Sequence, residues 1–84
     1  MYYVYILLMS NEKFYTGFTS NLKRRINEHK SGGNNTTSKF LPVKLIFYEC
    51  YLEKEDAVRR EKYFKTSKGK TTLRIMLMKT LEKN

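Results

Sequence analysis

The chain opens with two short apolar runs separated by a polar turn. Residues 2–9 are aromatic or aliphatic at every position, which is typical of a strand covered on both faces. Residues 10–12 supply turn chemistry, and an aromatic-rich run resumes over residues 13–19. This pattern predicts a β-hairpin whose first strand is central in a sheet.

The register of this hairpin decides which side chains share a face. If Tyr5 lies opposite Gly17, then Leu7 lies opposite Tyr15. Tyr5 and Tyr15 are then diagonal neighbours on one face, and Gly17 leaves space beside them. We take this register as a working assumption.

Four residues that follow the hairpin have the spacing of one helix face. Leu22, Arg25, Ile26 and His29 fall at i, i+3, i+4 and i+7. Two polar side chains therefore share the stripe that turns toward the sheet. The pattern predicts an amphipathic helix through these positions.

The ends of this helix are marked by residues with known capping behaviour. Thr19 or Ser20 can cap its start, and Gly32-Gly33 can close its end. The polar segment 34–40 predicts an exposed loop, which either contacts a backbone phosphate or only connects elements.

The second half of the chain predicts one more strand and two more helices. Pro42 ends the loop, residues 43–51 have the pattern of a strand, and residues 53–65 begin with acids and end with bases, as a helix dipole favours. The apolar stripe of this helix consists of Ala57, Val58 and Phe64. Glu61 falls on the same stripe, and an acid there needs a partner.

The last predicted helix starts at Thr71 or Thr72 and runs through Leu81. It is apolar on most sides, so we expect it to be well packed, with Met76 and Met78 as flexible core filler. With no repeat or linker in the sequence, residues 1–84 are expected to form a single domain.

Length and charge narrow the possible functions. A chain of 84 residues has a thin core, so any site should be a shallow groove. Seventeen Lys and Arg against eight acids give a net charge of +9, which fits a nucleic-acid binder and equally a plain basic protein. A membrane partner is not expected, because no long amphipathic stretch pairs a basic face with an apolar one.

A single cysteine excludes two further classes of small protein. Cys50 alone can build neither a disulfide framework nor a thiolate zinc site, and we expect it to be a small buried hydrophobe. The apolar run 2–9 is too short to span a membrane and lacks the features of a signal peptide. We therefore expect a reducing cytoplasmic location.

Several motifs, in this order and spacing, resemble one known family. They are Tyr3-Val4-Tyr5, Tyr15-Thr16-Gly17, the stretch 21–29 and the segment 57–62. Together they resemble the GIY-YIG nuclease superfamily, and most of all its small stand-alone bacterial members. The resemblance covers residues 2–65. It implies an α+β fold, a small three-stranded antiparallel sheet flanked by about three helices, and cleavage of DNA phosphodiester bonds with a divalent metal, Mg²⁺ or Mn²⁺.

The resemblance also implies a set of catalytic residues. The motif tyrosines match Tyr5 and Tyr15, the helix arginine matches Arg25, the position after it matches His29, and the metal-binding glutamate matches Glu61. Each residue type suits the chemistry, which requires a nucleophilic water and neutralisation of charge on the phosphoryl oxygens.

Two of these residues have clear electrostatic tasks and a plain structural alternative. Glu61 can hold a hard cation together with waters, or it can form an ion pair with Arg59, Lys65 or Arg25. Arg25 can bind a phosphate with its planar fork, or it can be a solvated helix arginine.

The roles of the tyrosines and the histidine are left open by the sequence. A tyrosine with a pKa near 10 is only about 0.1% ionised at pH 7, so a tyrosine base needs nearby positive charge. Either Tyr5 or Tyr15 could take the water proton while the other positions it. His29 could relay a proton, could bind phosphate, or could be a packing residue.

The sequence departs from the family pattern in four places. Tyr3 stands where the first motif has glycine, and Phe18 stands where some relatives have a lysine. Segment 34–40 lacks the Tyr or His that some relatives place there. The asparagine that several members bring in after the metal-binding glutamate has only Asn84 as a candidate.

These observations favour a metal-dependent DNA endonuclease that acts in DNA repair or recombination. We expect it to select branched, flap or nicked DNA structures rather than a sequence. A protein partner could supply this specificity. Five basic residues are predicted to contact the nucleic-acid backbone: Lys23, Arg24, Lys30, Lys39 and Arg60.

Two alternatives compete with catalysis. One is a non-catalytic nucleic-acid-binding module, and the other is a small subunit of a DNA-processing assembly. The second would carry an exposed apolar patch, for which Tyr48, Tyr51 and Tyr63 are candidates.

Overall fold

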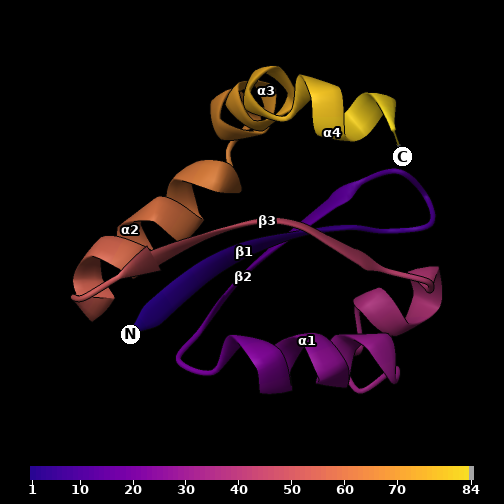
Figure 1. Cartoon of the computed structure of the whole chain (residues 1–84), viewed down its shortest axis with the longest axis horizontal. Coiled ribbons are helices and arrows are strands. Elements are labelled where there is room, and N and C mark those ends of the chain that lie inside the picture. The colour runs from indigo at the N-terminus through magenta and orange to yellow at the C-terminus, as the bar shows by residue number, and fades with distance from the viewer. Residues whose placement is uncertain (84) are drawn as a thin grey trace.

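The computed structural model describes residues 1–83 and consists of one antiparallel sheet between helices (Figure 1). Asn84 lies outside the described residues. The strands are β1 (Tyr2–Leu8), β2 (Phe14–Thr19) and β3 (Lys44–Tyr51), in the order β2-β1-β3. The helices are α1 (Leu22–Lys30), the 3-10 helix η1 (Thr37–Phe40), α2 (Lys54–Phe64), α3 (Ser67–Met76) and α4 (Met78–Glu82). The predicted α+β fold with a central first strand is confirmed.

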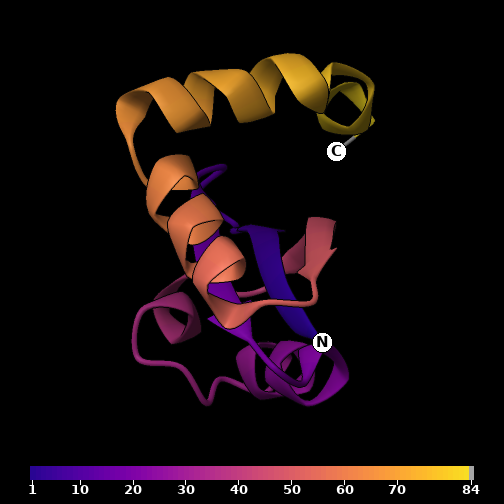
Figure 2. The same ribbon diagram turned by 90° about the vertical axis from the view of Figure 1, so that its left-hand side faces the viewer.

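The alternating side chains of β1 divide the core into two layers. Val4 and Ile6 are fully buried in a cluster with residues of α2 and α3, whereas Tyr5 and Leu7 are fully buried in a cluster with Ile26 of α1. The sheet therefore separates α1 from α2 and α3, as Figures 1 and 2 show. The all-apolar sequence of β1 follows from this burial on both faces.

The register of the hairpin is the predicted one. Tyr5 pairs with Gly17 and Leu7 pairs with Tyr15. Gly17 is needed because a Cβ at this position would overlap the ring and hydroxyl of Tyr5. The space that we expected beside Gly17 is thus filled by the Tyr5 ring, which reaches from the central strand toward the edge strand β2.

The ends of α1 agree with the prediction at the C-terminus and differ at the N-terminus. Gly32 has φ +85° and its N–H donates to the carbonyl of His29, while the Gly33 N–H donates to Glu28, which is the expected glycine closure. The N-cap, however, is Asn21, whose side chain accepts from the Arg24 N–H at 3.1 Å. Both predicted caps, Thr19 and Ser20, were wrong, and the Thr19 hydroxyl instead accepts from the backbone N–H of the N-cap residue Asn21.

The C-terminal helices begin earlier and are more exposed than predicted. Thr66 caps α3 by accepting from the Gly69 N–H at 3.0 Å, so the helix starts at Ser67 rather than at residue 71 or 72. Met76 and Met78 are 46% and 57% exposed, so the prediction that they fill the core was wrong. Leu73 and Leu77 are the buried core residues of this helical segment, and Leu81 packs against the same cluster.

Cys50 is also exposed, contrary to the prediction. It lies on the edge strand β3 opposite Tyr3, on the face of the sheet that α1 covers. Within residues 1–83, no helix is both long enough and apolar enough to cross a membrane.

Candidate active site

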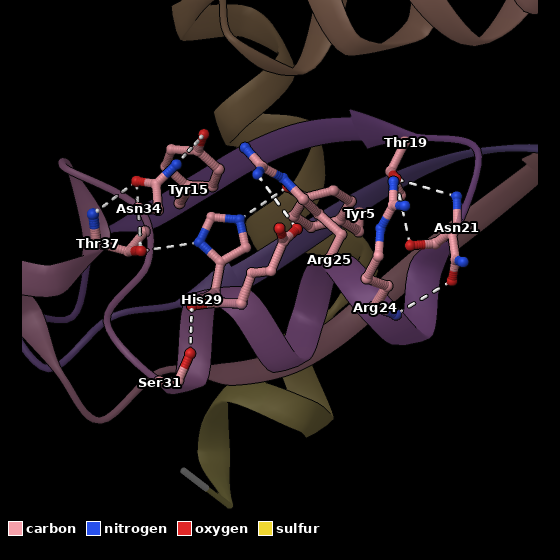
Figure 3. A network of polar contacts seen from close by, with 11 residues as sticks. Tyr5, Tyr15, Thr19, Asn21, Arg24, Arg25, His29, Ser31, Asn34 and Thr37 are labelled. Atoms are coloured by element: carbon pink, nitrogen blue, oxygen red, sulfur yellow. Dashed lines mark hydrogen bonds and ion pairs between the residues drawn. The ribbon is translucent and has the colours of Figure 1, made fainter.

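Tyr5 is the centre of a buried polar network that joins β1, α1 and η1 (Figure 3). Its hydroxyl lies 2.8 Å from His29 Nε2 and accepts from Arg25 Nε at 3.3 Å. Tyr5 and His29 have no exposed surface. The i, i+4 spacing on α1 thus brings Arg25 and His29 to one phenol, as the helical stripe predicted.

The hydrogen-bond directions in this network follow from its outer end. The Thr37 hydroxyl, which lies on η1, donates to Asn34 Oδ1 at 3.4 Å. Its oxygen therefore accepts from His29 Nδ1–H at 2.8 Å, and His29 Nε2 is left to accept the Tyr5 proton. Arg25 can only donate, so the direction of every hydrogen bond from Arg25 to Asn34 is fixed.

This arrangement requires a neutral imidazole. Burial lowers the pKa of His29, and the positive charge of Arg25 lowers it further, although Glu28 opposes both effects. His29 is therefore an acceptor for Tyr5 at neutral pH. The ring is held on its other side by Thr37.

Tyr15 lies at the outer side of the same network. Its ring packs edge-on against His29, with ring centres 4.9 Å apart, and its hydroxyl accepts from Asn34 Nδ2 at 3.4 Å. In contrast to Tyr5, it is partly exposed. Figure 3 shows Tyr15 and Asn34 together at one end of the network.

Arg25 has one nitrogen in the network and a side chain that is partly exposed. Its side chain is 35% exposed, and Nη1 lies 3.6 Å from Glu28 Oε1. The hydrogen bond to Tyr5 raises the pKa of Arg25, so the guanidinium stays charged. Its terminal nitrogens, which Tyr5 does not bind, can bind an anion.

Glu61 comes to the site from α2, on the other face of the sheet. Burial is the main cause that raises the pKa of Tyr5 to about 12, and the negative charge of Glu61 makes only the smallest contribution to that shift. Glu61 Oε2 also pairs with Lys65 Nζ at 3.1 Å, and the Glu61 side chain is 20% exposed. Of the two alternatives for Glu61, the ion pair with Lys65 is formed, and binding of a cation stays a prediction.

The predicted backbone-binding residues fall into two groups. Lys23, Arg24 and Lys30 on α1 and Lys39 on η1 are exposed. Arg60 is instead held by Glu49 on β3, with contacts of 2.9 and 3.1 Å to the two carboxylate oxygens, and its guanidinium lies 4.2 Å from the Phe64 ring centre. Arg60 thus joins α2 to β3, and its role in nucleic-acid binding stays a prediction.

The three tyrosines suggested for an apolar patch do not lie together. Tyr48 is 52% exposed on the α1 side of the sheet. Tyr51 and Tyr63 pack on the α2 side, where their hydroxyls contact Glu49 and Thr72. No single patch is formed.

The prediction that segment 34–40 is an exposed loop was wrong in part, because residues 37–40 form η1 and Thr37 is fully buried. Sequence reasoning therefore missed Asn34 and Thr37, which support the site from this segment. Asn34 Oδ1 accepts from the backbone N–H groups of Thr36 and Thr37, at 2.9 and 3.0 Å. An Asn followed by polar residues favours such a turn, so the sequence did indicate the local fold of this segment. The sequence did not indicate the contact of Thr37 with His29, because that contact depends on tertiary packing.

The fold and the site together define a class of protein. This is a small α+β domain in which two tyrosines, an arginine and a histidine converge on one face of a three-stranded sheet. Residues 1–74 match the model of the GIY-YIG catalytic domain, so the chain belongs to the GIY-YIG family.

Several relatives have similar length and sequence. A UPF0213 protein of Streptococcus agalactiae is 44% identical over 64 residues, which are 75% of this chain and 73% of the relative. A UPF0213 protein of Clostridium perfringens is 39% identical over 83 residues, covering 98% and 89% of the two chains. The solution NMR structure of a UPF0213 protein from Bacillus halodurans aligns with a TM-score of 0.58 at 36% identity, over 92% of this chain and 85% of that one.

Proposed function

We propose that this protein is a metal-dependent endonuclease that hydrolyses phosphodiester bonds in DNA. The observation that carries the proposal is the convergence of Tyr5, Tyr15, Arg25 and His29 in one hydrogen-bonded and ring-packed network. Membership of the GIY-YIG family supports the same reaction class.

The donor set at Glu61 suits a hard divalent cation. Mg²⁺ is commonly held by one or two carboxylates and completes its shell with waters and substrate phosphate oxygens. Glu61 offers one partly exposed carboxylate, and no cluster of three or more potential ligands occurs within residues 1–83. When bound there, the cation would supply positive charge to the phosphoryl oxygens and favour ionisation of a water.

Arg25 is assigned to the scissile phosphate. Its side chain is partly exposed, and Nε is fixed by the Tyr5 hydroxyl. An anchored guanidinium can donate two parallel hydrogen bonds to phosphoryl oxygens without losing much side-chain entropy. The charge that develops on those oxygens in the transition state strengthens these bonds.

The two tyrosines have different roles in this proposal. Tyr5 is fully buried and its pKa is raised to about 12, so it stays neutral and holds Arg25 and His29 in place. Tyr15 is partly exposed, so its hydroxyl is the one that can orient the attacking water. The water oxygen bonds to phosphorus and releases a proton to solvent as the bond to the departing sugar oxygen breaks, and that oxygen takes up a proton from solvent.

The substrate is proposed to be branched, flap or nicked DNA rather than a defined sequence. The exposed side chains of Lys23, Arg24, Lys30 and Lys39 would contact phosphates, which fixes the position of the DNA without reading bases. Selectivity would then come from DNA shape or from a protein partner, in DNA repair or recombination in the cytoplasm.

Cleavage of labelled single-stranded, duplex, nicked, flap and branched DNA tests the proposal. Products are expected with Mg²⁺ or Mn²⁺, not with EDTA, and not from Glu61→Gln or Arg25→Ala. Lys62→Ala, which changes an exposed residue on α2, serves as the control and should cleave normally. Binding without products on any substrate would refute catalysis and favour a binding module, and absence of both would point to an assembly subunit.

A further inference from the structure

A groove runs between α1 and β3, away from the catalytic side chains. It has a volume of about 500 Å³, which lies in the range of small-ligand sites. Tyr3 and Tyr48 line it from the sheet, and Lys23 and Asn27 line it from α1. The nuclease reaction proposed above makes no use of this groove except for Lys23.

The groove and the catalytic network lie on different sides of α1, although Leu22 and Ile26, which also line the groove, belong to the helical stripe that carries Arg25 and His29. Residues two apart on an α-helix point about 200° away from each other. Lys23 and Asn27 are each two residues from Arg25, so they face away from the side of α1 that holds the network. A DNA strand in the active site therefore leaves the groove free for another segment.

The two aromatic rings of the groove lie outside the apolar core, with Tyr48 exposed and Tyr3 half-buried. Tyr48 is 52% exposed, and the Tyr3 ring stands edge-on to it with ring centres 6.2 Å apart. Neither ring belongs to the two apolar clusters found among residues 1–83. Tyr3 occupies the motif position at which the family pattern has glycine, so the pair depends on a departure of this chain from that pattern.

The polar surroundings of these rings suit a nucleotide. Asn21, Asn27 and Ser20 supply amide and hydroxyl groups, and Lys23 supplies a positive charge, whereas no carboxylate is among the described residues that line the groove. Amides can pair with base edges, and a lysine can contact a phosphate. A second copy of this chain would bring its own charge of +9 to a basic face, which disfavours self-association there.

We propose that the groove binds an unstacked base of single-stranded DNA, with Tyr48 as the stacking platform, Tyr3 at its edge and Lys23 on the adjoining phosphate. Aromatic residues commonly bind single strands in this way. The inference deepens the proposed nuclease function, because it names a substrate with a single-stranded segment beside the cleaved strand. The groove would thus select flaps and branches over intact duplex.

Fluorescence anisotropy of a labelled thymidine oligonucleotide and of a blunt duplex, measured in EDTA, tests this proposal without cleavage. Tyr48→Ala is expected to weaken single-strand binding roughly tenfold to a hundredfold and to leave duplex binding within about twofold. Tyr48→Phe keeps the ring and should bind like the wild type. Leu52→Ala, which removes another exposed apolar side chain, is the matched control.

The outcomes separate this inference from the nuclease proposal. If Glu61→Gln retains the single-strand preference and loses cleavage, both the nuclease proposal and the groove proposal are supported. If the wild type never cleaves but Tyr48→Ala loses the preference, only the groove proposal is supported. Equal single-strand affinities for wild type and Tyr48→Ala would overturn the groove proposal. So would a change in oligomeric state in Tyr48→Ala, measured by sedimentation, without a change in DNA affinity.

Discussion

The ring of Tyr5 on β1 lies against the backbone of Gly17 on β2, in the space that any other residue's Cβ would fill. Because the ring passes under the edge strand, its hydroxyl reaches the α1 side chains Arg25 and His29. The glycine of the second tyrosine motif thus has a steric task, which is to let the tyrosine of the first motif reach the site.

Gly17→Ala should therefore destabilise the fold and disrupt the site together. The new methyl group has to displace Tyr5, and overpacking of this kind costs about 1–3 kcal/mol. In a double-mutant cycle, Gly17→Ala should cost much less stability in a Tyr5→Ala background, because the clash is then absent. Denaturant unfolding of the four proteins measures this coupling, and additive effects of the two changes would contradict the steric relationship.

Substitution of Tyr5 should mainly lower the stability of the fold, whereas substitution of Tyr15 should mainly lower the cleavage rate. Tyr5→Phe leaves His29 Nε2 buried without its donor, so we expect a loss of about 1–3 kcal/mol in the free energy of unfolding. Tyr15→Phe removes only a long contact from Asn34 in a partly exposed place, so its stability should change little while cleavage falls by about a hundredfold or more. Thermal unfolding and initial cleavage rates distinguish the two. A destabilised but fully active Tyr15→Phe would contradict these assignments.

His29 should make the fold sensitive to mild acid. Its pKa is lowered in the folded protein by burial and by Arg25, whereas in the unfolded chain it has its ordinary value of 6.5. Below that value the unfolded chain binds more protons than the folded one, so stability present above pH 6.5 is lost as the pH falls toward the folded pKa.

Urea unfolding between pH 7.5 and pH 5 measures this loss, since most carboxyl groups titrate at lower pH, around 4. Because the chain has one histidine, its imidazole NMR signals report the folded titration without ambiguity. His29→Gln should be less stable at pH 7.5 but should have a flatter pH profile than the wild type. An equal slope in the variant would show that another group is responsible.

Much of the catalytic side of the fold could be predicted because it depends on short-range periodicity. The alternation of β1 places Tyr5 on one face, the hairpin register sets Tyr15 beside it, and the helical stripe brings Arg25 and His29 to the same face. Each of these relationships is fixed by spacing within one element or one hairpin. They agree with the structure for that reason.

The relationships that escaped prediction depend on contacts between distant segments. Thr37 binds His29 because η1 folds over the end of α1, and Arg60 is held by Glu49 because α2 crosses β3. Such pairings leave no periodic signal in the sequence. The prediction that Met76 and Met78 are buried was wrong for a related reason. Their apolar side chains do not indicate that a terminal helix packs only one of its faces against the domain.

Lys65 offers a test of Glu61 as the metal-binding carboxylate. The ion pair between Lys65 Nζ and Glu61 Oε2 has to loosen when a cation takes the carboxylate. Lys65 is 57% exposed, and ion pairs of this kind contribute at most about 1 kcal/mol, so the competition is mild. Lys65→Ala should consequently lower the Mg²⁺ concentration that gives half-maximal cleavage, by up to about fivefold.

Titration of the cleavage rate with Mg²⁺ gives this value for the wild type, for Lys65→Ala and for Lys62→Ala. Lys62 lies on the same helix and is exposed, so its removal changes the net charge by the same amount without touching the Glu61 pair. A shift confined to Lys65→Ala supports cation binding at Glu61. Equal shifts in both variants would mean that general electrostatics governs the metal dependence, and no shift in either would place the cation away from this carboxylate.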